Sequence, residues 1–389
     1  MWRPPAALLL GLALTLPAWW PLAFADTDHL IFWAAGNQVV TGGSPYPTEV
    51  WVALAREYPH SHLQEMMAAP DAGLVWIYPP WTALLFAPFG ALPREAGLWA
   101  LHVAYVLGSV LAVSALIALA PWRSERTRSL AALVAITFQP LVIAAHWGQF
   151  TGWLVLGAAL VLMALRRRGL AGLLAGAVLL AAKPQLTAVA GGVVALRLAH
   201  RRAWRQLGGT VAGLAALAAL AIALDPGALA SMLLGARQRV EAVNRFPTTW
   251  GFARSSGLEQ WPLLAIALIA IALVACVVAV RGSTDRRDDT ALAAALAFGV
   301  ALTPYALTYE QALLTPALVL SAAGADRCRP LPKALLLCAL VALAALCWTL
   351  FATSGTGPSL GIVPTLAVLL LAGAGAAARR WPAQAGATP

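Results

Sequence analysis

Charged residues are scarce in this sequence, at 11% of its 389 residues, whereas soluble domains carry roughly 25%. Hydrophobic residues make up 61%, and the mean hydropathy is +0.77. A membrane-spanning helix needs about 20 mostly apolar residues, so crossings account for most of the length. The composition therefore excludes a soluble enzyme, leaves no room for a second domain of ordinary size, and predicts one membrane domain over residues 1–389.

Cysteine and lysine are also rare. The four cysteines have neither disulfide nor metal-ligand spacing, so we expect no redox role and no metal site. Only two of the 26 basic residues are lysines, and the arginines lie in short clusters between apolar runs, which membrane orientation explains better than nucleic-acid binding. A phosphate-binding glycine loop and a serine nucleophile elbow are both missing from the sequence, which argues against nucleotide-driven chemistry.

The basic clusters predict which connections are cytosolic, because cytosolic loops carry an excess of Lys and Arg. These clusters are "RRR" at 166–168, "HRRAWR" at 200–205, "RGSTDRR" at 281–287, "DRCRPLPK" at 326–333 and "RR" at 379–380. The remaining connections carry acids, prolines and tryptophans and are expected outside: 26–75, 145–149, 182–185, 225–261, 303–311 and 354–361. The pattern predicts an all-α, multi-pass protein of the inner (plasma) membrane with about 12 crossings and both termini cytoplasmic.

Two segments complicate this topology. The run from Pro5 to Ala25 ends in "AFA", which resembles a signal-peptidase site, but it is long enough to span, and we expect an uncleaved first helix. The cluster "RSERTR" at 123–128 would lie outside if both Trp81–Leu92 and Gly97–Leu119 crossed. Since about a dozen residues are too few for a crossing, we expect Trp81–Leu92 to dip into the membrane and return. The alternative is that the charge rule fails there.

Asp28 is the first candidate for chemistry. It directly follows the first apolar run, in "TDHLIFWAAGNQVVTGGSPYP" at 27–47, and we expect Thr27 to cap a short interfacial helix with Asp28 in its first turn. A carboxylate there is favoured by the helix dipole by under about 1 kcal/mol, which is a sufficient structural reason for its presence. The same dipole keeps the carboxylate ionised, as a general base requires.

Lys183 lies at the tip of an apolar hairpin predicted from two short segments, Leu170–Ala182 and Leu186–Ala199. Pro184 removes a backbone donor and breaks the helix there. Because broken backbone at membrane depth is tolerated only where protein or water surrounds it, the tip indicates a cavity. Lys183 either extends to the membrane interface or forms an anion site, for example for a lipid phosphate.

Further polar residues fall on the same predicted outer side, in "HWGQF", "TPYALTYEQ", "WIYPPW" and "KPQ". Any one of these segments is equally typical of a plain interfacial turn, but their common side favours a shared pocket. The candidate substrate-binding residues are Lys183, His146, Gln149, Gln185, Tyr78, Tyr305, Tyr309 and Glu310.

Four segments, in this order and spacing, resemble the family-87 glycosyltransferases of the GT-C superfamily: "TDHLIFWAAGNQVVTGGSPY", "YPPWTALLFAPFGALP", "GQFTGWLVLGAALVLMALRRRGLAGLLAGAVLLAAKPQL" and "TPYALTYEQALLTP". The resemblance covers a little under half of the chain. It implies a polytopic GT-C helical fold with a pocket at the extracytoplasmic face. It also implies a polyprenyl-phosphate sugar donor, mannose in the best-known members, and a lipid or glycan acceptor.

The residue roles that follow come from the resemblance. The family's catalytic acid precedes a Phe-Trp-Ala-Ala-like stretch, which places it at Asp28 as the general base of an inverting transfer. Lys183, with His146 and Gln149, would meet the charge of the leaving phosphate, and no nucleotide or obligatory metal is expected. The chain departs from the family in having His29 after the aspartate, where phenylalanine is common, and Glu310 after Tyr309, where aspartate is common. Some members also have a histidine near the position of Tyr305.

Two other classes of protein share some of these features. A transporter or flippase of a lipid-linked or hydrophobic substrate would also have a broken helix and a buried charge, but it should show two related halves with paired discontinuous helices, and the sequence has none. A membrane scaffold would not need an acid-rich outer loop together with Lys183 and the polar turns. The segment 225–261 is the expected acceptor side, or a helix lying on the bilayer surface.

Overall fold

The computed structural model describes residues 4–20, 24, 27–58, 63–64, 67, 76–241, 285–303 and 306–354, and throughout these residues the regular structure is helical. The elements in chain order are α1 (Pro4–Leu14), α2 (Leu16–Trp19), α3 (His29–Val40), α4 (Thr48–Glu57), α6 (Pro80–Gly90), α7 (Arg94–Leu119), α8 (Glu125–Ile136), α9 (Gln139–His146), α10 (Thr151–Arg167), α11 (Leu170–Ala181), α12 (Pro184–His200), α13 (Trp204–Leu224), α14 (Ala228–Glu241), α17 (Asp285–Leu302), the 3-10 helix η3 (Thr308–Leu314), α18 (Thr315–Ala325) and α19 (Pro330–Ser354).

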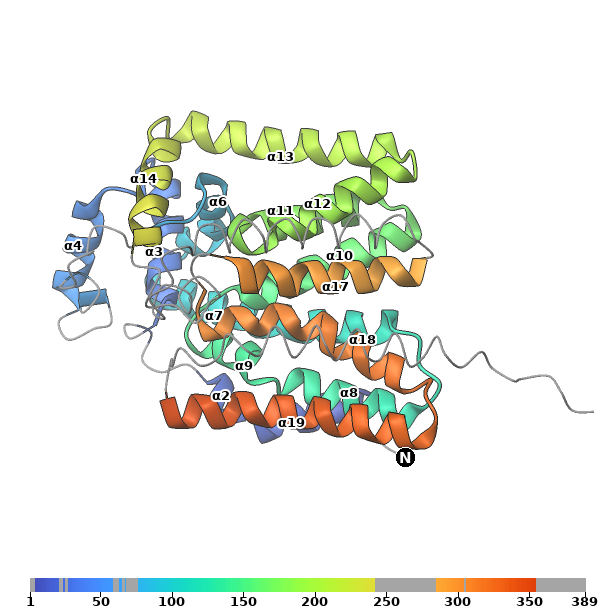
Figure 1. The fold of residues 1–389 in the computed structure, drawn as a ribbon. Coiled ribbons are helices and arrows are strands. Elements are labelled where there is room, and N and C mark those ends of the chain that lie inside the picture. The colour runs from blue at the N-terminus through green and yellow to red at the C-terminus, as the bar shows by residue number, and fades with distance from the viewer. Residues whose placement is uncertain are drawn as a thin grey trace, which may run out of the picture.

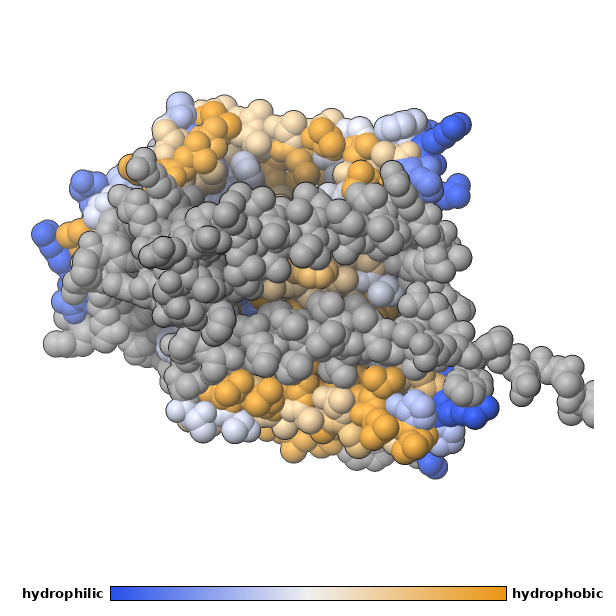
Figure 2. All heavy atoms as spheres, in the orientation of Figure 1, coloured by the Kyte–Doolittle hydropathy of each residue, from blue (hydrophilic) through white to orange (hydrophobic). Residues whose placement is uncertain are grey.

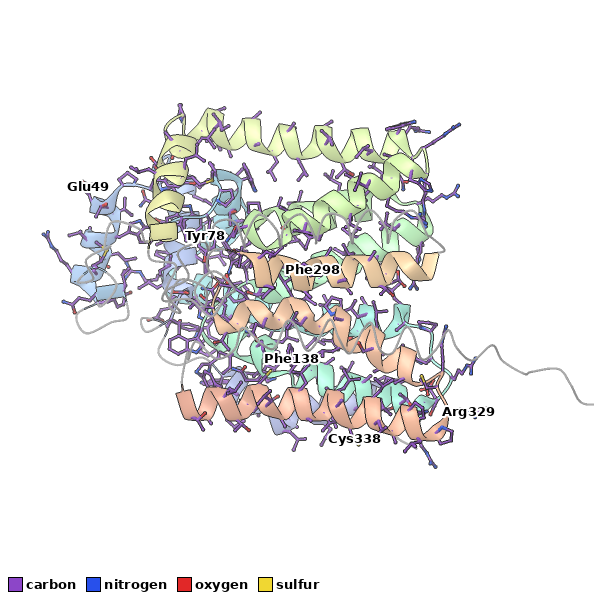
Figure 3. All side chains as sticks on the ribbon, in the orientation of Figure 1. Glu49, Tyr78, Phe138, Phe298, Arg329 and Cys338 are labelled. Carbon is purple, nitrogen blue, oxygen red and sulfur yellow. The ribbon has the colours of Figure 1, made fainter. Side chains whose placement is uncertain are left out.

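The longer helices run side by side, and the connections between them alternate between two ends of the bundle (Figure 1). One end, called here the polar end, carries α3, α4, α6 and α14. The other, called the basic end, carries the α7–α8, α10–α11, α12–α13 and α18–α19 connections. In Figure 3, Glu49 and Arg329 mark the polar and the basic end, respectively.

Four stretches in the described part of the chain are long and apolar enough to cross a membrane: Arg94–Leu119, Glu125–His146, Trp204–Leu224 and Pro330–Thr353. In Figure 2, hydrophobic residues cover the visible parts of α13 and α19, and the most hydrophilic residues gather at the basic end and around α4. An apolar band between two hydrophilic ends is what a bilayer requires. The protein is therefore a multi-pass, all-helical membrane protein.

The cluster at 123–128 lies at the basic end. The backbone N–H groups of Arg123 and Ser124 donate to the Asp326 carboxylate at 2.6 and 2.8 Å, and Lys333 forms an ion pair with the same carboxylate at 2.6 Å. Burial raises the pKa of Asp326, but these donors lower it more, so the pKa lies below its usual value and the carboxylate stays charged. The α7–α8 and α18–α19 connections, which are distant in sequence, thus lie together at the basic end.

The short helix α6 explains how the cluster at 123–128 comes to lie at the basic end. It has 11 residues, which at 1.5 Å per residue span about 17 Å, well short of the roughly 30 Å of a bilayer core. The 26 residues of α7 then run from the polar to the basic end. The segment predicted to dip into the membrane is thus a single short helix at the polar end, and α7 alone brings the chain to Arg123.

Two expectations for the N-terminal part were wrong. The apolar run from Pro5 is not one continuous helix, because it is interrupted at Thr15, between α1 and α2, where Pro17 lies in the first turn of α2. The helix α3 does not lie along an interface with one apolar stripe. All eight of its first residues, His29–Gly36, are buried.

Close backbone packing of α3 against α6 explains this burial. A Cβ atom on Gly36 would collide with the Phe86 carbonyl, and one on Gly90 would collide with the backbone of α3 at Asn37. The Asn37 side chain also donates to the Gly90 carbonyl at 2.9 Å. The amphipathic helix of this region is α4 instead, which buries Trp51 and exposes Glu49.

Candidate active site

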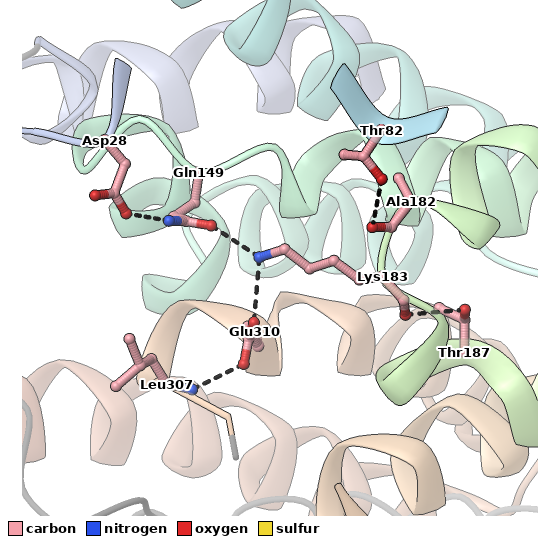
Figure 4. Close-up of polar contacts among 8 residues, drawn as sticks. All are labelled: Asp28, Thr82, Gln149, Ala182, Lys183, Thr187, Leu307 and Glu310. Carbon is pink, nitrogen blue, oxygen red and sulfur yellow. Dashed lines mark hydrogen bonds and ion pairs between the residues drawn. The ribbon is translucent and has the colours of Figure 1, made fainter. Parts of the chain in front are cut away.

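Asp28 is the N-cap residue of α3, a place that the sequence had assigned to Thr27. Its backbone has helical dihedral angles, and its side chain makes no capping hydrogen bond to α3. The carboxylate instead accepts a hydrogen bond from the side-chain amide of Gln149 (Figure 4). Because the side chain is aimed away from the helix end, capping does not account for its position.

The turn that carries Gln149 holds the start of α3 in place. The backbone N–H of Asp28 donates to the Trp147 carbonyl at 3.0 Å. The next residue, Gly148, has a φ of +77°, a value that residues with a side chain rarely adopt. A Cβ atom at Gly148 would also collide with the backbone nitrogen and the ring of His29. The glycine therefore permits both the turn and its close contact with α3.

We expect Gly148→Ala to destabilise the protein by about 1–3 kcal/mol and to impair activity, because the strained turn and the collision with His29 displace Asp28. The matched control is Gly42→Ala, since Gly42 has a φ of +75° but nothing within 4 Å of the added Cβ. Thermal unfolding and turnover of both variants check the prediction. Equal losses in both would mean that backbone strain alone is responsible.

Lys183 lies between α11 and α12, where Pro184 begins the second helix. The break leaves carbonyl groups at the end of α11 without helical partners. Side chains of α6 satisfy two of them: the indole of Trp81 donates to Ala181 at 2.8 Å and Thr82 donates to Ala182 at 3.1 Å. Thr187 of α12 adds hydrogen bonds to the carbonyls of Leu180 at 2.7 Å and Lys183 at 3.1 Å, which also accept backbone N–H groups.

The Lys183 ammonium group is completely buried and forms two hydrogen bonds with described residues. It donates to the Gln149 side-chain oxygen at 2.8 Å and to a carboxylate oxygen of Glu310 at 3.1 Å. The other carboxylate oxygen of Glu310 accepts from the backbone N–H of Leu307 at 2.8 Å. A buried charge is tolerated when it is paired and hydrogen-bonded. Here Lys183 and Glu310 form the ion pair, and each makes a further hydrogen bond, to Gln149 and Leu307 respectively.

Gln149 connects Asp28 with Lys183. Its amide nitrogen donates to the carboxylate and its oxygen accepts from the ammonium group (Figure 4). Since a carboxylate can only accept and an ammonium group can only donate, this is the one orientation of the amide that serves both. The result is a line of four side chains, Asp28–Gln149–Lys183–Glu310, which we call the polar line.

Aromatic rings surround the ammonium group of the polar line. It lies 4.7 Å from the ring centre of Phe150, 5.4 Å from that of Tyr78 and 5.5 Å from that of Tyr309. These distances fall within the range of cation–π attraction. The rings keep the site poor in water, which strengthens the field of the lysine charge.

The other predicted site residues stand apart from the polar line or outside the described residues. His146 is half-buried, and its ring Nδ1 is hydrogen-bonded to the Trp20 carbonyl at 2.8 Å. Gln185 is half-buried in the first turn of α12, and within the described residues no hydrogen bond joins it to the polar line. Tyr305 lies outside the described residues. The structure thus brings together six of the predicted residues. Hydrogen bonds join Asp28, Gln149, Lys183 and Glu310, and the rings of Tyr78 and Tyr309 contact the Lys183 ammonium group.

Sequence reasoning missed a buried pair of histidines next to Asp28. The ring of His29 is hydrogen-bonded to Thr27 at 2.8 Å and to the ring of His102 at 3.1 Å. His102 lies within an apolar helix and belongs to no motif, so nothing local indicated it. Trp81 and Thr82 were missed as supports of the Lys183 break, although the "WIYPPW" segment had been singled out.

Among the residues that the structure describes, no group of three or more His, Cys, Asp or Glu side chains could hold a metal ion. The polar line places a carboxylate at the start of a helix, and the side-chain amide of Gln149 joins it to a buried lysine. Such an arrangement can accept a proton at one point and stabilise negative charge near another.

A comparison with protein-family models matches glycosyltransferase family 87 over residues 76–309. No curated protein and no solved structure matches the chain. The matched region includes Gln149 and Lys183, whereas Asp28 precedes it and Glu310 follows its last residue. The match spans more than half of the chain, so this protein belongs to glycosyltransferase family 87.

Proposed function

We propose that the protein transfers a hexose, most simply mannose, from a polyprenyl-phosphate donor to a lipid or glycan acceptor, with inversion at the anomeric carbon. Membership of a glycosyltransferase family gives the reaction class and sets the transporter interpretation aside. The observation that carries the proposal is the polar line, because it pairs a candidate base with a buried cation at one end of a membrane bundle. Such a pair suits a lipid-linked donor with a phosphate leaving group.

Asp28 is the proposed general base. As the acceptor hydroxyl oxygen attacks the anomeric carbon, its proton passes to the Asp28 carboxylate, and the bond between that carbon and the phosphate oxygen breaks. The electron pair of this bond leaves with the polyprenyl phosphate. Attack from the face opposite the phosphate inverts the configuration. The amide of Gln149 holds the carboxylate in the orientation that receives the proton.

Lys183 is the proposed source of positive potential for the leaving phosphate. Its charge is fixed by Gln149 and Glu310 before substrate arrives, so it needs no reorganisation during the reaction. The aromatic rings of Tyr78, Phe150 and Tyr309 limit screening by water. His146 remains a proposed substrate-binding residue, as the resemblance implies, and Tyr305 and Gln185 remain so because their segments fall on the same predicted side.

The polar end is proposed to face the extracytoplasmic side. The connections at the basic end include the arginine clusters at 166–168 and 200–205, which favours a cytosolic position for that end. The donor would then enter from the outer leaflet, with its polyprenyl chain in the bilayer and its sugar phosphate at the polar line. The helix α14 lies at the same end, and the acceptor is proposed to approach there.

The donor class is tested with the full-length protein in nanodiscs. Radiolabelled polyprenyl-phosphate mannose and a nucleotide-linked mannose are supplied in parallel with a lipid and glycan extract as acceptor. Label should pass from the lipid-linked donor only, and NMR of the product should show the opposite anomeric configuration to that of the donor. Transfer from the nucleotide sugar, or retention of configuration, would refute the proposal.

A further inference from the structure

A cavity lies at the basic end, between the α10–α11 and α12–α13 connections. Its volume is about 570 Å³, which is within the usual size of ligand pockets, about 300–1,000 Å³. The residues that define its character are Arg168, Arg201, Arg202, Arg205, Trp204 and Gln206. The proposed transfer reaction makes no use of them.

The cavity concentrates positive charge. Four of its described lining residues are arginines, and none is acidic. Arg201 also joins the α12–α13 connection to the last turn of α10, because its guanidinium group donates to the Leu165 carbonyl at 3.1 Å. The side chains of Arg168 and Arg205 are exposed at the mouth. Like charges gathered around one hollow repel one another unless an anion binds between them, and the guanidinium group fits phosphate oxygens in two-point contacts.

The backbone at this cavity is strained in two places. Arg168 has a φ of 56° and Arg202 a φ of 54°, and among the described residues these are the non-glycine positions with positive φ. Side chains rarely adopt this region, and such strain tends to persist where binding or catalysis requires it. Both residues line the same cavity, one from each connection.

Gln206 lies at the wall of the cavity. Its side-chain nitrogen has almost no accessible surface and no hydrogen-bond partner within the described part of the chain, so it does not face the open space. The arginines are therefore the groups that can hold a phosphate, because each guanidinium group offers paired N–H donors to its oxygens.

The exposed apolar residues of α13 beside the cavity indicate that the phosphate belongs to a lipid. Trp204 is 61% exposed at the start of α13, as interfacial tryptophans are, and Val211, two turns further along the same side of the helix, is 57% exposed. We propose that the cavity binds the phosphate headgroup of an anionic phospholipid whose acyl chains lie along this apolar face of α13. Basic pockets between helices on the cytoplasmic side of a membrane suit such headgroups.

The test uses the full-length protein in detergent, titrated with phosphatidylglycerol or phosphatidylcholine and followed by native mass spectrometry. The variant is Arg168→Asn with Arg202→Asn, because asparagine tolerates positive φ and the fold is therefore kept. The apparent Kd for phosphatidylglycerol should rise roughly 30-fold, as expected for the loss of two arginines at a headgroup. Phosphatidylcholine binding should not change.

The matched control is Arg123→Gln with Arg126→Gln, which removes the same charge from exposed positions at the basic end outside the cavity. It should bind phosphatidylglycerol as the wild type does. An unchanged Kd in the cavity variant, or an equal loss in the control, would overturn the proposal. Displacement of the lipid by an equal concentration of glycerol phosphate would show that the cavity takes a soluble anion and would overturn the lipid assignment.

Discussion

Replacing Asp28 with asparagine is expected to lower the rate of sugar transfer by about 10²- to 10⁴-fold, the usual contribution of general base catalysis. The substitution preserves the size of the side chain and an oxygen that can accept the hydrogen bond from Gln149. It removes the ability to take a proton at neutral pH. The folded state should therefore survive while the reaction fails.

Initial rates with radiolabelled polyprenyl-phosphate mannose, measured in nanodiscs, provide the readout. The matched control is Glu49→Gln, which neutralises an exposed carboxylate of α4 at the same end of the molecule. The control should transfer sugar at the wild-type rate. If Asp28→Asn also does so while its thermal unfolding is normal, another group is the base.

Replacing Lys183 with methionine is expected to have the largest effect on stability. It leaves the Glu310 carboxylate buried without its cation, and breaking a buried ion pair in this way costs about 3–5 kcal/mol. It also removes the positive potential proposed for the leaving phosphate. Thermal unfolding in detergent and transfer assays on the folded fraction measure the two effects separately.

The double variant Lys183→Met with Glu310→Gln distinguishes stability from catalysis. A neutral glutamine at position 310 can be buried without the Lys183 cation, so most of the lost stability should return. The rate of sugar transfer should stay low. Lys333→Met is a control because Lys333 is the only other lysine and pairs with Asp326 at the basic end, far from the polar line. Recovery of full activity in the double variant would show that Lys183 is needed only for folding.

Local sequence signals predicted the Lys183 hairpin well. Pro184 ends α11 and starts α12, and both helices begin and end within two residues of their predicted bounds. The same signals could not specify which partners the lysine would have. Gln149 is 34 residues away in sequence and Glu310 is 127 away, so their contacts depend on how the helices pack.

The burial of α3 shows a limit of predicting a helix's environment from the periodicity of its apolar residues. An apolar stripe predicted a helix on a surface, but the backbone contacts allowed by Gly36 and Gly90 bury the first two turns on every side. The position of Asp28 changed for a related reason. The cap expected at Thr27 required only a local hydrogen bond, whereas the long-range contacts with Trp147 and Gln149 determine where α3 begins.

Gln149 has one more consequence for the proton that Asp28 would take up. An amide neither releases nor gains a proton near neutral pH, so this side chain passes electrostatic influence between the carboxylate and the lysine but conducts no proton. Glu310, the second carboxylate of the polar line, is thereby insulated from the first. On the proposed mechanism, the proton taken up by Asp28 would not reach the buried ion pair through Gln149, so that pair can keep its charges through every catalytic cycle.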